Sequence, residues 1–163
     1  MKKLHVMTYC ALLSAAALIL FTVEAQLPPL TAIPGVKPGL ANIVTVFALY
    51  TVGAWNALAV LLVRIVLGGL LTGQVSAILY SLCGGLLAWA VSSLLKRFFA
   101  PSKLWVLSVL AALAHNLGQL LCAVLITETA ALLWYLPILM ISGILAGALT
   151  GITAQLILKR LKK

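Results

Sequence analysis

The residues of this chain best suited to chemistry form a polar group, His115, Asn116 and Gln119, inside the apolar run "SVLAALAHNLGQLLCAVLI" at 108–126. An imidazole and two side-chain amides donate and accept several hydrogen bonds, which suits a binding site and also suits a contact between helices. In hydrocarbon such groups need partners, because an unpaired polar group is costly there. The sequence leaves both interpretations open, a bound ligand or a facing helix.

Helical spacing brings these side chains to one face of the run. At 100° per residue, Gln119 lies about 40° and Asn116 about 100° from His115. Small residues such as Ala111 share this face, so we expect it to point into the protein. We expect the opposite face to meet lipid; it consists of Leu110, Leu113, Leu117, Leu120, Leu121 and Val124.

Arg64 is the second chemical feature, because it lies near the middle of another apolar run, 55–73. A guanidinium does not lose its proton, so it requires a neutral acceptor, a water-filled cavity or a bound anion. Alternatively it extends toward the membrane surface or binds carbonyls at a helix end. Both acids, Glu24 and Glu128, are expected at the outer edge. Asn42 and Tyr80 are further candidates for the lining of a cavity.

The composition places these residues in a membrane protein. The chain has 163 residues, of which 64% are hydrophobic and 8% charged, and a strongly positive mean hydropathy. Apolar stretches near twenty residues predict helices, whereas a barrel would show short alternating segments. We expect an all-α membrane protein forming one domain, 1–163, a compact bundle of six transmembrane helices. The expected spans are about 5–23, 39–53, 55–73, 75–95, 104–126 and 132–157.

The charge distribution predicts the orientation. Of the eleven Lys and Arg residues, all but Lys37 and Arg64 fall on one side if the spans alternate, and both acids fall on the other. Basic loops remain in the cytoplasm, so we expect both termini inside and the protein in the cell (cytoplasmic) membrane. The net charge of +9 is explained in this way, and no nucleic-acid partner is expected. The residues on the basic side are Lys2, Lys3, Lys96, Arg97, Lys103, Lys159, Arg160, Lys162 and Lys163.

The segment 24–38 contains four of the six prolines and is expected as an ordered outer loop. It would serve either as a lid or as a plain connector. The preceding "VEAQ" resembles a signal-peptide cleavage site, but the orientation favours a retained first helix.

Small residues predict close helix contacts. Gly143, Gly147 and Gly151 recur every four residues in the last span, a spacing that lets helix backbones approach. Ala11 and Ala15 form a further small pair on the first span, which would pack internally or dock another membrane protein.

Several classes of function are not expected. The chain has no aspartate, two glutamates, no P-loop and no CxxC or Cys/His cluster. We therefore expect no catalytic residue, metal or cofactor. Active uptake would need energy from another protein, because no intramembrane carboxylate is expected.

Several blocks resemble the Gx transporter family, also labelled heptaprenyl diphosphate synthase component I. They are "PGVKPGLANIVTVFALY" at 34–50, "RIVLGGLLTG" at 64–73, "YSLCGGLLA" at 80–88, "AHNLGQLL" at 114–121 and "YLPILMISGILAGALTG" at 135–151. This family is in turn similar to S components of energy-coupling-factor transporters. That likeness implies a lid in the first outer loop. It also implies a docking motif, Ala11 and Ala15, for a transmembrane coupling subunit driven by ATPases.

The resemblance implies a substrate-binding membrane subunit of an uptake transporter for a vitamin, quinone or isoprenoid-precursor-type solute. The expected binding residues are Arg64, His115, Asn116, Gln119, Asn42 and Tyr80. The alternative is a non-catalytic membrane component associated with heptaprenyl diphosphate synthesis, or a structural assembly subunit. Prenyl synthases hold diphosphate through magnesium on aspartates, which this chain lacks.

Overall fold

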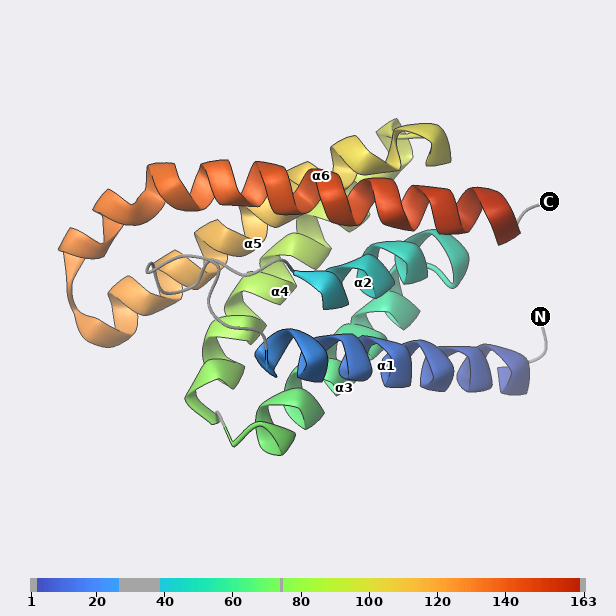
Figure 1. The fold of residues 1–163 in the computed structure, drawn as a ribbon, viewed down its shortest axis with the longest axis horizontal. Helices are drawn as coiled ribbons and strands as arrows, with labels where there is room; N and C mark the ends of the chain where they lie inside the picture. The colour runs from blue at the N-terminus through green and yellow to red at the C-terminus, as the bar shows by residue number, and fades with distance from the viewer. Residues whose placement is uncertain (1–2, 27–38, 74, 162–163) are drawn as a thin grey trace.

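The computed structural model describes residues 3–26, 39–73 and 75–161, and these residues fold into six α-helices joined by short segments (Figure 1). The helices are α1 (Lys3–Gln26), α2 (Leu40–Thr51), α3 (Ala54–Leu71), α4 (Val75–Leu95), α5 (Leu104–Thr127) and α6 (Leu136–Leu161). Short 3₁₀ helices span Lys96–Phe98, Pro101–Lys103 and Ala130–Tyr135. Since the described residues contain no strand, the predicted all-α bundle of six helices is confirmed.

Five of the six helices are long and apolar enough to cross a membrane, and α2 is shorter, with 12 residues. A helix of that length covers about 18 Å, whereas the hydrocarbon core of a bilayer is about 30 Å thick. The outer surface of the bundle is rich in exposed leucine, as at Leu145 (68% exposed) and Leu125 (78% exposed). The chain is a multi-pass membrane protein.

Some helix boundaries differ from those expected. Helix α1 continues through Gln26, so the beginning of the expected outer loop is helical, and the remainder, 27–38, lies outside the described residues. Helix α6 begins at Leu136 rather than at 132, after the 3₁₀ helix Ala130–Tyr135. Pro137 follows directly, and proline suits a first helical turn because its missing N–H would have no partner there.

The helices are arranged as a ring. The principal neighbours run α1, α3, α4, α5, α6, α2 and back to α1, with α2 also packed against α3. The two ends of the chain lie at the same end of the molecule, at the right of Figure 1. The short α2 completes the ring between α1 and α6.

Glycines allow the close contact between α5 and α6. A Cβ atom added at Gly147 would lie 2.7 Å from the Val109 Cα, and one at Gly151 would lie 2.6 Å from the Trp105 Cα. Gly143 faces the Asn116 side chain, at 2.8 Å from Nδ2 by the same construction. The three glycines of the predicted ridge thus lie along α5.

Helix α5 also packs closely on its other side, against α4. A Cβ atom at Gly118 would lie 2.7 Å from the Cys83 carbonyl oxygen. Because α4 and α6 cover two sides of α5, the prediction that its leucine face meets lipid is wrong for Leu120. That side chain is buried, whereas Leu121 is exposed. The other members, Leu110, Leu113, Leu117 and Val124, are half-buried.

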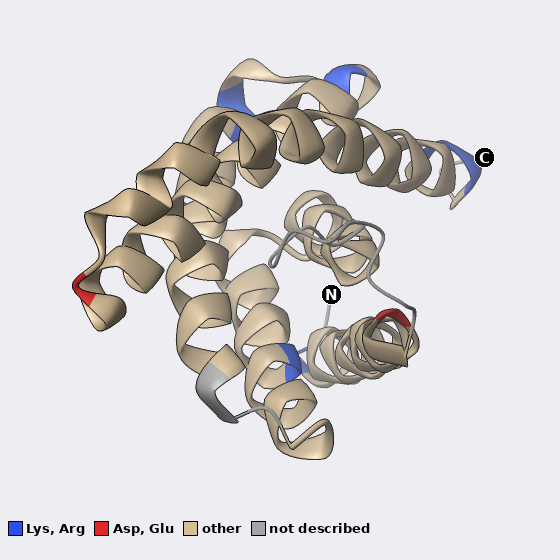
Figure 2. Cartoon of the chain, turned by 60° about the vertical axis from the view of Figure 1, so that its left-hand side comes forward, with Lys and Arg blue, Asp and Glu red and all other residues tan. Residues whose placement is uncertain are grey.

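Charged residues are sparse along the helices (Figure 2). Apart from Arg64, the described basic residues stand at the start of α1, between α4 and α5, and at the end of α6, which is the end where the termini lie. They are Lys3, Lys96, Arg97, Lys103, Lys159 and Arg160. Glu128 follows α5 at the opposite end and adopts a left-handed conformation with φ 52°.

Candidate functional site

A cavity of about 500 Å³ lies inside the ring, and every helix contributes to its lining. All six residues expected to bind a ligand line it. They are Asn42 of α2, Arg64 of α3, Tyr80 of α4, and His115, Asn116 and Gln119 of α5. Residues separated by up to 77 positions in sequence are therefore brought to one space (119 − 42 = 77). The structure shows this juxtaposition, and whether a ligand occupies it stays a prediction.

Arg64 is buried, with 6% of its surface exposed. Its Nη2 atom donates to Asn42 Oδ1 at 3.3 Å, and its Nε atom has no partner among the described residues. The Phe21 ring lies 6.0 Å from the guanidinium carbon, within the range of a cation–π contact. Phe21 reaches this position because Gly68 has no side chain: a Cβ there would lie 2.7 Å from the ring. Arg64 therefore keeps N–H donors that form no hydrogen bond with a described residue.

Glu24, expected at the outer edge, lies in the last turn of α1, and its side chain is buried. It is 8% exposed and lines the same cavity as Arg64. Its carboxylate accepts a hydrogen bond from the Gly39 backbone N–H at 2.5 Å, at the start of α2. The Glu24 side chain therefore joins the end of α1 to the start of α2. The cavity thus contains an acid and a base.

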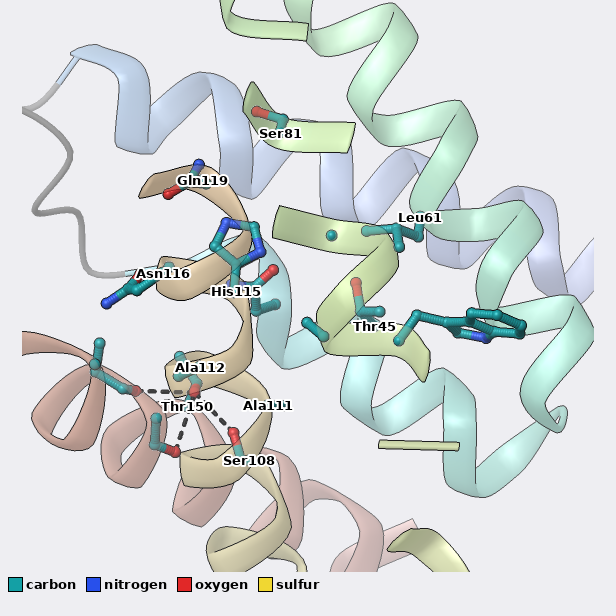
Figure 3. A pocket seen from close by; sticks show the side chains of 18 of the residues that line it. Thr45, Leu61, Ser81, Ser108, Ala111, Ala112, His115, Asn116, Gln119 and Thr150 are labelled. Carbon is teal, nitrogen blue, oxygen red and sulfur yellow. Dashed lines mark hydrogen bonds between the residues drawn. The ribbon is translucent and has the colours of Figure 1, made fainter. Parts of the chain in front are cut away.

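His115 and Gln119 lie one turn apart on α5, against α4. A Cβ atom at Gly84 would lie 2.6 Å from Gln119 Cγ and 3.1 Å from His115 Cε1, so this glycine makes room for both side chains. Figure 3 shows them on one side of α5, with Ser81 of α4 nearby. This side of α5 is the one that the helical spacing assigned to the protein interior.

Asn116 points to the other side of α5 from His115 (Figure 3). Its Nδ2 atom donates to the Leu139 carbonyl oxygen of α6 at 2.6 Å. One of its N–H groups therefore joins two helices, as in the alternative interpretation of this residue, although the side chain also lines the cavity.

Further lining residues were not among those expected to bind a ligand. Thr45 faces the cavity with a buried hydroxyl that has no partner among the described residues. Trp89 donates from Nε1 to the Ala54 carbonyl at 2.8 Å, and Ser108 bonds to Thr150 at 3.1 Å (Figure 3). Single hydroxyls and a tryptophan are common in membrane helices, so only the tertiary structure distinguishes these.

The end of the cavity near the termini is closed by α2 and its contacts. Leu49 lines the cavity there and packs with Ala57 and Leu107. Lys96 donates from Nζ to the Leu49 carbonyl at 2.6 Å, and Tyr50 donates from its hydroxyl to the Phe99 carbonyl at 3.0 Å. Apolar packing and these two bonds fix the end of α2 to the segment between α4 and α5.

Glu24 and several of the residues expected to bind a ligand lie toward the other half of the cavity. Glu24 lies in the last turn of α1, Asn42 in the first turn of α2, and Tyr80 near the start of α4. Among the described residues no three His, Cys, Asp or Glu side chains gather in a way that could hold a metal ion. The geometry suits hydrogen bonding to a small molecule with an apolar body.

Ala11 and Ala15, the expected docking residues, lie on the exposed surface of α1 and do not line the cavity. Their exposure leaves them free to contact another protein or lipid.

Fold and cavity define a multi-pass α-helical membrane protein with an internal cavity that is mostly apolar and has a few polar groups. The model of the family described as heptaprenyl diphosphate synthase component I matches residues 13–157, and the chain belongs to this family, as the sequence blocks predicted. Neither a curated protein nor a solved structure matches the chain.

Proposed function

We propose that this protein is a substrate-binding membrane subunit that holds a small solute in its central cavity during uptake across the cell membrane. The observation that supports this most is Arg64, which lines a cavity of about 500 Å³. It is buried, and its Nε atom has no hydrogen-bond partner among the described residues. Cavities of this size, mostly apolar with a few convergent polar groups, are typical of small-molecule sites. Arg64 would face an electron-rich group, and His115 and Gln119 would orient the molecule.

The position of the polar groups supports entry from the side opposite the termini. With both termini in the cytoplasm, the half of the cavity that contains Glu24 lies toward the outside and the half closed by Leu49 toward the cytoplasm. Energy would come from separate subunits, a transmembrane coupling protein with ATPases that docks on Ala11 and Ala15. The solute would be of the vitamin, quinone or isoprenoid-precursor type.

The test is mass spectrometry of the small molecules retained by the protein purified in detergent. We expect a retained molecule in the wild type, and loss of it in Arg64→Ala and His115→Ala variants that still unfold cooperatively. Ile141→Ala, at a 62% exposed position on α6, is the control and should retain it. If nothing is retained by the wild type and both cavity variants fail to fold, the polar residues serve packing alone.

Docking is tested separately. Ala11→Leu and Ala15→Leu should keep the retained molecule and lose co-purification with the coupling subunit, because leucine would block a close helix contact. Loss of the molecule in these variants would contradict a role limited to docking.

A second candidate function comes from the family description, which names a component of heptaprenyl diphosphate synthase. On this alternative the chain is a non-catalytic membrane partner of a synthase subunit. Co-purification with a prenyl synthase, and no coupling subunit or ATPase, would favour it over uptake.

A further inference from the structure

Among the described residues that line the cavity, two carry a formal charge at pH 7, and these charges cancel. Arg64 is positive and Glu24 negative, with histidine counted as neutral. The two side chains are 6% and 8% exposed, so both charges are withdrawn from solvent. A ligand with net charge would leave an uncompensated charge inside a membrane protein, which is costly.

The two charges do not neutralise each other by direct bonding. Within the described chain Arg64 hydrogen bonds to Asn42, Glu24 hydrogen bonds to Gly39, and no hydrogen bond joins Arg64 to Glu24. Arg64 carries five N–H donors and has one such bond, at 3.3 Å, and a carboxylate has about four acceptor positions. Both groups therefore keep hydrogen-bonding capacity for a molecule in the cavity.

The remainder of the lining suits an apolar body. Leu61, Ala111 and Leu120 contribute aliphatic surface, and Trp89 contributes an aromatic ring. Gln119 contributes a further hydrogen-bond donor to the lining, and Thr45 offers a buried hydroxyl with no partner among the described residues.

We propose that the cavity recognises a net-neutral molecule with separated charges on an apolar body, whose negative group binds Arg64 and whose positive group binds Glu24. This inference rests on the proposed binding function and narrows its substrate class. A single arginine balanced by a glutamate is a poor match for a diphosphate, which carries several negative charges. The cavity therefore favours a zwitterion over a prenyl diphosphate.

The test compares three probes that share a phenyl body: free phenylalanine, 3-phenylpropionate and 2-phenylethylamine. Binding to the full chain in lipid nanodiscs is measured by calorimetry at pH 7. Charge-assisted hydrogen bonds are worth about 1.5–3 kcal/mol, so we expect wild-type protein to bind free phenylalanine about tenfold or more tightly than either single-charge probe.

The variants should change this ranking in opposite directions. Glu24→Gln should remove the preference over 3-phenylpropionate, and Arg64→Gln should remove the preference over 2-phenylethylamine. Glu128→Gln is the matched control, because Glu128 is an exposed acid outside the cavity, and it should leave the ranking unchanged.

Three results would overturn the inference: 3-phenylpropionate binding the wild type as tightly as free phenylalanine, a ranking unchanged in Glu24→Gln, or no binding of any probe. If a cavity variant does not fold, the ranking in wild type and Glu128→Gln decides. A retained native molecule with net negative charge would leave the proposed binding function intact and overturn the charge assignment alone.

Discussion

Asn42 is the one described residue that hydrogen bonds to the buried Arg64 guanidinium. Its replacement in Asn42→Ala would leave Nη2 unpaired, so we expect the free energy of unfolding to fall by about 1–3 kcal/mol. Unfolding of the detergent-purified protein, followed by circular dichroism, measures this. Asn42→Asp is the control, since it keeps an acceptor beside the arginine and should be at least as stable as the wild type. Equal stability of Asn42→Ala and wild type would show that Arg64 does not depend on this bond.

Variants of the two side-chain amides of α5, Asn116 and Gln119, should distinguish a role in helix packing from a role in ligand binding. Asn116 donates to the Leu139 carbonyl, whereas Gln119 has no hydrogen bond to a described residue. Asn116→Ala should lower the free energy of unfolding by about 1 kcal/mol, within the range for bonds between membrane helices. Gln119→Ala should leave stability unchanged and weaken retention of the bound molecule. Unfolding and mass spectrometry on both variants test this; the reverse pattern would contradict the assignment.

At the scale of helices, the α5–α6 contact depends on residues without side chains. An added Cβ would lie 2.6 Å from the Trp105 Cα at Gly151 and 2.7 Å from the Val109 Cα at Gly147. Both distances are shorter than a van der Waals contact, and backbone atoms cannot move aside cheaply. We expect Gly147→Ala and Gly151→Ala each to cost about 1–3 kcal/mol of unfolding free energy.

Thermal unfolding in detergent would measure this cost. Leu145→Ala, on the exposed side of the same helix, is the control and should change stability little. If the glycine variants are as stable as this control, the close approach of α5 and α6 is not required for folding.

Periodicity accounts for what could be predicted about these helices. The 3.6-residue repeat places His115 and Gln119 on the interior face of α5, and the apolar stretches predict six helices. Periodicity gives an angle around one helix and says nothing about its neighbours, which is why Leu120 was assigned to lipid. Glu24 was missed for a related reason: its burial comes from the extension of α1 and from the Gly39 N–H, a tertiary contact.

At the scale of the whole molecule, the two ends of the ring differ. One end has apolar packing around Leu49, the bonds of Lys96 and Tyr50, and most of the basic residues. The other has Glu24 in the last turn of α1, Asn42 in the first turn of α2, and the start of α6. A protein that receives a solute at one surface and releases it at the other needs such an asymmetry.

The orientation of this asymmetry follows from charge and is the last prediction. The described basic residues other than Arg64 gather at the end of the termini, and positive loops remain in the cytoplasm. We therefore expect Thr129→Cys to lie outside and Ser102→Cys inside, both at exposed positions. Each is made in a chain whose own cysteines are replaced by alanine; these are Cys10, Cys83 and Cys122.

A membrane-impermeant maleimide added to intact cells should label Thr129→Cys and leave Ser102→Cys unlabelled. Permeabilised cells are the control, because both positions should then react if both variants are folded and accessible. Labelling of Ser102→Cys alone in intact cells would show that the orientation in the membrane is the reverse of the expected one. The half of the cavity that contains Glu24 would then open to the cytoplasm, and Glu24 and Arg64 would receive a ligand from inside, which fits a synthase partner better than an uptake subunit.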